Sequence, residues 1–213
     1  MIKSRWRTES STFALTADAN GETGSRHSNG LNQFFLSIED RENLSLLDFG
    51  GASQANVTFI TNLGHRIYTE DALRSIDDVF GSDPDMQSNP VRVEMFLNQV
   101  LDFPDEHFDG VLVWDVLQFL SPAAAQATVD RLRRILRPHA YLLAFFNANE
   151  KVPAVPEFNY RISDSKTLVL TQRGIRPPAQ FFNNRNIERL FQKYHSIKFF
   201  LTRNSLREVI VRR

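Results

Sequence analysis

The chain of 213 residues contains no cysteine. This absence excludes disulfide bonds, thiolate nucleophiles, iron–sulfur clusters and zinc sites built from cysteine, and it suits a reducing compartment. Long hydrophobic runs are also missing, since no apolar stretch approaches the roughly 20 residues of a membrane-spanning helix. The N-terminus lacks the apolar core of a secretory signal. We therefore expect a soluble cytoplasmic protein without a membrane span.

Several motifs of catalysis and metal binding are missing as well. The five histidines are scattered, and no two of them have the helical or hairpin spacing of metal ligands. The sequence contains neither a Gly-x-Ser-x-Gly nucleophile turn nor a Gly-x-x-x-x-Gly-Lys phosphate loop. We therefore predict no metal site, and hydrolase and nucleoside-triphosphatase functions are disfavoured.

The chain has no net charge, but its basic residues are concentrated near the C-terminus. Residues 176–213 contain nine Lys or Arg and two Glu, whereas acidic residues outnumber basic ones in residues 44–175. A basic region can attract nucleic acid. Here the charges alternate with apolar residues, which is typical of a solvated face. Binding of nucleic acid is therefore not expected.

The first part of the chain differs in composition from the rest. Residues 1–29 are rich in Ser, Thr, Asn, Gly and charged residues, and they bury too little apolar surface to offset the entropy of ordering. A short helix is predicted over residues 31–38. We expect residues 1–43 to form a flexible tail with this helix, and residues 44–213 to form one domain. The alternative is a tail that folds over the active site when substrate binds.

From residue 44 onward, apolar strands alternate with amphipathic helices, as in a doubly wound α/β sheet. A Pro-rich segment, residues 147–181, interrupts the alternation and is predicted to be a cap insertion containing a hairpin. The predicted strands of the sheet are residues 44–49, 67–69, 91–97, 108–115 and 141–146, followed by an antiparallel terminal hairpin of residues 197–201 and 206–211.

The first two predicted strands carry the most specific signal. Asp48 ends the first strand and is followed by the turn residues Gly50 and Gly51, and Asp71 lies 23 residues farther on at the end of the second strand. This order is used by nucleoside-binding βαβ units, in which the second acid holds a ribose. Glu70 is the neighbouring alternative, but strand alternation favours Asp71. A nucleoside cofactor is therefore predicted.

Downstream motifs add a family resemblance that covers about residues 44–213. Residues 104–109, Pro-Asp-Glu-His-Phe-Asp, precede an apolar strand and Asp115-Val116-Leu117, and residues 132–138 form a Leu-x-x-x-Leu-Arg-Pro passage into the next strand. In this order the motifs resemble the class I S-adenosylmethionine-dependent methyltransferases, particularly the small bacterial "type 11" kind. The resemblance implies a Rossmann-like seven-stranded sheet, S-adenosyl-L-methionine as cofactor, and methyl transfer to an unidentified acceptor, expected to be a small molecule.

The resemblance also implies the site residues. Asp115, after the fourth strand, and Gln118, one helical turn on, are the candidate catalytic residues that contact cofactor or substrate. Cofactor contacts are expected at the ends of the first four strands, namely Asp48, Gly50, Gly51, Ala52, Asp71, Asn98 and Asp115.

Some of these residues have alternative interpretations. Asp48 could fix the glycine turn, Asp71 could cap the following helix, and Asp115 could cap the following turn. Ala52 and Gln54 stand where the family usually has glycine. The alternative function is therefore a catalytically inactive methyltransferase-like binding or scaffolding module, and an NAD-dependent enzyme is a weaker alternative.

Overall fold

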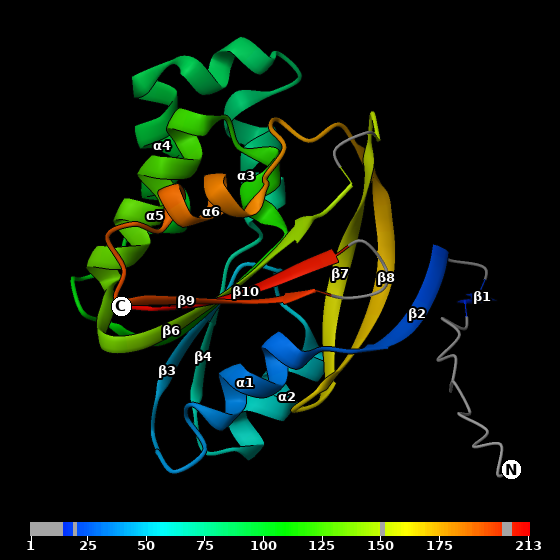
Figure 1. Ribbon diagram of the computed structural model, residues 1–213, viewed down its shortest axis with the longest axis vertical. Coiled ribbons are helices and arrows are strands. Elements are labelled where there is room, and N and C mark those ends of the chain that lie inside the picture. Colours follow the sequence, from blue (N-terminus) through cyan, green and yellow to red (C-terminus); the bar gives the residue numbers. More distant parts are fainter. Residues whose placement is uncertain (1–14, 19–20, 150–151, 202–205) are drawn as a thin grey trace, which may run out of the picture.

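The computed structural model describes residues 15–18, 21–149, 152–201 and 206–213 (Figure 1). Its central sheet has six strands in the order β4-β3-β5-β6-β10-β9. The neighbouring strands β4, β3, β5 and β6 are parallel, whereas β10 is antiparallel to β6 and β9. The strands are β4, Arg66–Thr69; β3, Ser45–Asp48; β5, Phe108–Trp114; β6, Leu136–Asn147; β10, Leu206–Arg212; and β9, Ser196–Leu201.

Helices cover both faces of this sheet (Figure 1). Consecutive residues of β3 point to opposite faces of the sheet, and both faces are apolar. Leu46 packs with the core on the α1 and α2 side, and Leu47 packs with the core on the α3 to α6 side. None of the helices in the described part of the chain is long and apolar enough to cross a bilayer. The helices are α1, Asn29–Leu36; α2, Gln54–Asn62; α3, Ala72–Phe80; α4, Pro90–Val100; α5, Pro122–Ile135; and α6, Asn184–Leu190; two short 3-10 helices are η1, Pro84–Ser88, and η2, Val116–Phe119.

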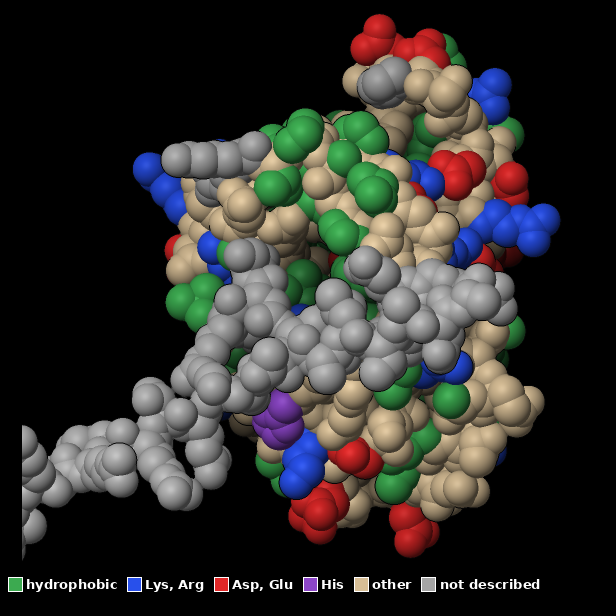
Figure 2. All heavy atoms as spheres, turned by 90° about the vertical axis from the view of Figure 1, so that its right-hand side faces the viewer, with side chains coloured by type: hydrophobic (Ala, Val, Ile, Leu, Met, Phe, Trp, Pro, Cys, Tyr) green, Lys and Arg blue, Asp and Glu red, His purple; other side chains and the backbone are tan. Residues whose placement is uncertain are grey.

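A second, antiparallel sheet, here called the small sheet, lies beside the central sheet on the α1 and α2 side (Figure 1). Its order is β1-β2-β8-β7, with β1 at Leu15–Asp18, β2 at Gly21–His27, β7 at Val155–Asp164 and β8 at Thr167–Arg176. Its inner residues join the core around α1. Figure 2, viewed from this side, shows hydrophobic side chains gathered on the upper half of the surface.

Most predicted elements are present. The runs expected to form strands at residues 44–49, 67–69, 108–115 and 141–146 correspond to β3, β4, β5 and β6. The hairpin expected within residues 147–181 is formed by β7 and β8. Ser121 caps α5 by accepting a hydrogen bond from the backbone N–H of Ala124, as the Ser-Pro start predicts. Residues 202–205, between the two strands of the expected terminal hairpin, lie outside the described residues.

The predicted third strand is wrong. Residues 91–97 belong to the helix α4, so the central sheet has six strands in the described part of the chain and not seven. Asn89 caps this helix and Pro90 occupies its first position, which is a helix-start signal. The buried residues Val93, Phe96 and Val100 repeat with helical spacing, and this outweighs the short alternation that suggested a strand.

The first residues also differ from the predicted flexible tail. Residues 15–18 and 21–27 form β1 and β2, and residues 23–27 of β2 pair with β8. Backbone hydrogen bonds to the insertion therefore order a polar segment that buries little apolar surface itself. The short helix expected over residues 31–38 is present as α1.

Candidate functional site

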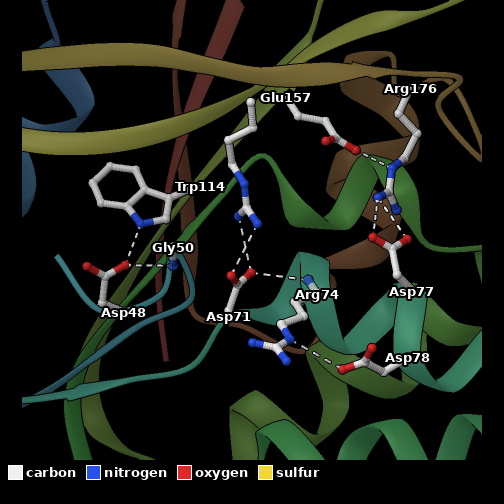
Figure 3. Close-up of polar contacts among 10 residues, drawn as sticks. Asp48, Gly50, Asp71, Arg74, Asp77, Asp78, Trp114, Glu157 and Arg176 are labelled. Atoms are coloured by element: carbon white, nitrogen blue, oxygen red, sulfur yellow. Dashed lines mark hydrogen bonds and ion pairs between the residues drawn. The ribbon is translucent and has the colours of Figure 1, made fainter. Parts of the chain in front are cut away.

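The parallel strands of the central sheet end at one edge, and an acidic residue stands at the end of three of them. Asp48 is the last residue of β3, Asp71 lies two residues beyond β4, and Asp115 directly follows β5. Open α/β sheets bind ligands at this edge. Figure 3 shows Asp48 and Asp71 with their polar partners.

Asp48 is fully buried and accepts hydrogen bonds from three protein donors. These donors are Trp114 Nε1 at 2.6 Å, the backbone N–H of Gly50 at 2.8 Å and Asn56 Nδ2 at 2.8 Å (Figure 3 shows the first two). Burial raises the pKa of Asp48 above its ordinary value, and the three hydrogen bonds oppose that rise. Asp48 therefore fixes the glycine turn, one of the two roles its position allowed.

The glycine turn packs tightly against the chain's own side chains. Gly51 has a φ of +79°, which favours glycine, and a Cβ there would lie 3.3 Å from the Cβ of Asp71. A Cβ at Gly50 would lie 3.0 Å from Trp114 Nε1. The space close to this turn is therefore taken by Trp114 and Asp71.

Ala52 and Gln54, which replace glycines of the family pattern, do not crowd the turn. Ala52 is exposed. Gln54 begins α2, and its Nε2 donates to Thr58 Oγ1 at 3.1 Å, one turn along the helix. The Gln54 side chain is therefore held along the exposed surface of α2, away from the turn.

Asp71 already has two partners. It caps α3 by accepting from the backbone N–H of Arg74 at 3.1 Å, and both its carboxylate oxygens pair with the Arg173 guanidinium from β8 at 3.2 Å. Both side chains of this ion pair are about one-third exposed, at 33% and 29%. The neighbouring Glu70 has no hydrogen bond or ion pair to its carboxylate within the described ranges, and burial raises its pKa.

A second arginine of β8 reaches the same edge. Arg176 forms ion pairs with Asp77 of α3, at 2.8 Å, and with Glu157 of β7 (Figure 3). The buried Asn56 of α2 also binds β7, since its Nδ2 donates to Tyr160 O at 3.0 Å and its Oδ1 accepts from the N–H of Ile162 at 2.8 Å. These contacts hold the β7–β8 hairpin against the edge where Asp48 and Asp71 lie.

Asn98 does not reach this edge. The residue was expected at the end of a third strand, but it lies on α4 with its side chain exposed. Its Oδ1 accepts from Arg131 of α5 at 3.5 Å. Because residues 91–97 form a helix, the adenine contact predicted for Asn98 has no support in the structure.

Asp115 and Gln118 line one cavity of about 410 Å³ between the two sheets. Asp115 is 2% exposed, and burial raises its pKa to about 7. The Tyr160 hydroxyl faces it closely enough to oppose this rise, although no hydrogen bond of standard geometry reaches that hydroxyl. Gln118 is 4% exposed, and its Oε1 accepts from the backbone N–H of Asn147 at 3.0 Å. The two candidate catalytic residues therefore lie together.

The cavity has a mainly apolar wall. Most of its lining comes from the small sheet and from the ends of β6 and β10. The other lining residues are Arg26, Asn147, Asn149, Val152, Val155, Pro156, Phe158, Tyr160, Leu170 and Leu206.

Several residues of this region escaped the sequence analysis. Trp114 is buried in the core, but it also donates to Asp48 and stacks on Tyr160, with ring centroids 4.9 Å apart and planes 2° apart. Its φ of +55° is unusual for a bulky residue, and no sequence pattern reveals it. Arg26 and Arg173 carry no motif, and only the placement of the small sheet brings them here.

Comparison with known proteins gives one family. Residues 47–144 match the model of a family described as a methyltransferase domain. No protein of curated function matches the chain.

Solved structures that resemble the chain include a SAM-dependent methyltransferase from Archaeoglobus fulgidus, at 12% identity over 86% of this chain and 91% of that one, with a TM-score of 0.49. One from Methanosarcina mazei has 13% identity over 84% and 96%, with a TM-score of 0.46. The Burkholderia thailandensis 1,6-didemethyltoxoflavin-N1-methyltransferase, solved with bound 1,6-didemethyltoxoflavin and S-adenosylhomocysteine, has 11% identity over 93% and 97%, with a TM-score of 0.43.

Proposed function

We propose that the chain is a class I methyltransferase that binds S-adenosylmethionine and transfers the methyl group to a small molecule; residues 47–144 match the family model of a methyltransferase domain. The observation that carries this proposal is the family match, which spans β3 to β6 and includes all three acids at the sheet edge. We place the activity in the cytoplasm, which the lack of cysteine supports.

The residues at the edge suit the chemistry of this cofactor. Ribose hydroxyls need hydrogen-bond acceptors, and the carboxylates of Glu70 and Asp71 supply them at the end of β4. Gly50 and Gly51 provide the turn beside them. The ion pair with Arg173 engages both oxygens of Asp71, so this arginine competes with a ribose for the carboxylate.

When bound, S-adenosylmethionine supplies an electrophilic methyl group on a positively charged sulfur. The chain's own contribution is to orient the acceptor, exclude water and receive a proton. Asp115 suits the last task, because a carboxyl with a pKa of about 7 is substantially ionised at neutral pH and still basic. Gln118, fixed by Asn147, is placed to orient the acceptor in the same cavity.

Calorimetric titration of the purified chain with S-adenosylhomocysteine and with NAD tests the proposal. We expect saturable binding of the sulfur nucleoside and no comparable binding of NAD. Asp71→Asn should weaken binding by roughly 1.5–3 kcal/mol, the range for a hydrogen bond to a charged group. Arg173→Ala should strengthen binding by about tenfold, since it frees Asp71. Arg161→Ala, on the neighbouring strand β7, is the matched control because its guanidinium donates to Thr171 instead.

One observation favours a second function, a methyltransferase-like binding module without catalysis. Asp48 already has three donors, and Asp71 already has an arginine. In that case neither the wild-type chain nor Arg173→Ala should bind S-adenosylhomocysteine. Binding by either protein would support the enzyme, and tight NAD binding without it would contradict both functions.

A further inference from the structure

The cavity at Asp115 has features of a small-molecule site that the family match does not define. At about 410 Å³ it falls within the ~300–1,000 Å³ range of ligand pockets, and it combines an apolar wall with a few polar groups, as such pockets do. Its walls come from both sheets, and of its lining residues only Asp115 and Gln118 lie within residues 47–144.

Two polar atoms in the wall lack a hydrogen-bond partner among the described residues. Tyr160 is 2% exposed and Arg26 is 9% exposed, and both the Tyr160 hydroxyl and Arg26 Nε are buried without a hydrogen-bond partner among the described residues. A buried polar group left unpaired destabilises the protein. A ligand that pairs with such groups offsets this destabilisation. Together with the buried Asp115, the wall therefore offers one acceptor and two donors.

The charge of the wall favours a neutral ligand. Arg26 is the only Lys or Arg among the lining residues that the structure describes, and it forms an ion pair with the fully buried Glu208. Glu208 also accepts from Ser28 Oγ at 3.0 Å and from the N–H of Gly30 at 2.6 Å. Because the positive charge of Arg26 is already balanced, an anionic ligand would be buried without a countercharge, which is costly.

The wall also selects between kinds of hydrogen-bonding group. A hydroxyl can donate to Asp115 and at the same time accept from the Tyr160 hydroxyl, whereas an indole-type N–H can only donate. Phe158 and Tyr160 pack edge to face, with ring centroids 6.1 Å apart, beside the aliphatic Leu170. Such a wall fits the flat body of an aromatic molecule.

We propose that this cavity binds a neutral aromatic alcohol, with its ring against Phe158 and Leu170 and its hydroxyl between Asp115 and Tyr160. The binding itself needs no cofactor. The proposal rests on the proposed function only in making this hydroxyl the methyl acceptor.

The probes are 2-naphthol, its methyl ether 2-methoxynaphthalene, and indole, each titrated into the purified full chain without cofactor and followed by calorimetry. We expect one site per chain and at least tenfold tighter binding of 2-naphthol than of the ether, since the ether cannot donate to Asp115. Asp115→Asn should reduce this preference at least threefold, and Asp40→Asn, an exposed control residue outside the cavity, should preserve it.

Tyr160→Phe removes only the hydroxyl and should weaken binding of both naphthalene compounds. Equal affinities for 2-naphthol and its ether, tighter binding of indole, or no binding of any probe would overturn the proposal. A titration with S-adenosylhomocysteine on the same sample separates the two proposals. Binding of 2-naphthol with no binding of S-adenosylhomocysteine would support this cavity while contradicting the proposed transferase.

Discussion

The ends of β3 and β4 and the end of β5 lie along the same sheet edge, yet their acids have different surroundings. Asp48 and Asp71 each accept hydrogen bonds from several protein donors. Asp115 instead lies in a cavity where the Tyr160 hydroxyl and Arg26 Nε are buried without a hydrogen-bond partner among the described residues. The first two acids are therefore engaged by the chain itself, whereas the third lies beside unpaired donors. A resemblance that places binding residues at all three strand ends does not reveal this difference.

The largest effect on stability is expected when the charge pair in the cavity wall is broken. Glu208→Gln removes the charge that compensates Arg26 and should lower the free energy of unfolding by about 3–5 kcal/mol, because it leaves a buried cation unpaired. Urea denaturation measures this change. Glu94→Gln, which removes one side of the exposed pair with Arg131, is the control and should cost less than about 1 kcal/mol. Similar losses in both variants would contradict the assigned role of Glu208.

The next largest effect is a change of stability with pH that depends on the protonation of Asp115. Its pKa is raised when the protein is folded, so the folded state holds a proton more tightly than the unfolded state between about pH 4 and pH 7. Stability should therefore fall as pH rises through that window, and Asp115→Asn should escape this loss. Relative to wild type, the variant should gain up to about 4 kcal/mol by pH 8.

Denaturation of both proteins from pH 4 to pH 8 measures this gain. Burial is the main cause of the raised pKa, with Tyr160 and Arg173 opposing it and Glu157 adding to it. A constant difference across the range would show that Asp115 is not buried as a proton-holding group.

Trp114 offers a test of the hydrogen bonding around Asp48 at the end of β3. Trp114→Phe keeps an aromatic ring against Tyr160 but removes the N–H that donates to the buried Asp48, so it should cost about 1–3 kcal/mol. A double-mutant cycle with Asp48→Asn checks the cause. If the two substitutions add without coupling, the hydrogen bond between these residues does not carry the effect.

The smallest effect is expected at Gln54. Since its side chain bonds to Thr58 along α2, Gln54→Gly should change the affinity for S-adenosylhomocysteine by less than tenfold, or about 1.4 kcal/mol. Ser53, the cap of α2, stays in place as the structural reference. A larger gain in affinity would mean that Gln54 restricts the glycine turn after all.

Local sequence signals predicted the strands that are buried on both faces of the central sheet. The runs at residues 44–49 and 108–115 are mainly apolar on both faces, as central strands require, and they form β3 and β5. Residues 91–97 were wrongly predicted to form a strand because apolar and polar residues alternate at the start of the segment. The helical repeat of apolar residues becomes clear only when the segment is followed to Val100. The site prediction for Asn98 depended on that predicted strand, and because the segment is a helix, Asn98 does not reach the site.

The partners of the site acids could not be predicted in the same way. Arg173 lies 102 residues from Asp71, and Tyr160 lies 104 residues from Asn56. Neither pair has a motif or a spacing, because the contacts depend on where the insertion packs against the sheet. The positions of Asp71 and Asp115 at strand ends were predictable, but their occupied or open state was not.

The pairing of Arg26 with Glu208 also bears on the order in which the protein can be made. These two residues are 182 positions apart, and a ribosome synthesises the chain from the N-terminus at about 5–20 residues per second. Arg26 must therefore wait until residue 208 has been synthesised before its buried partner is available. The parallel strands β3 to β6 can pair during that interval, whereas the wall of the cavity is completed only after β10 has been made.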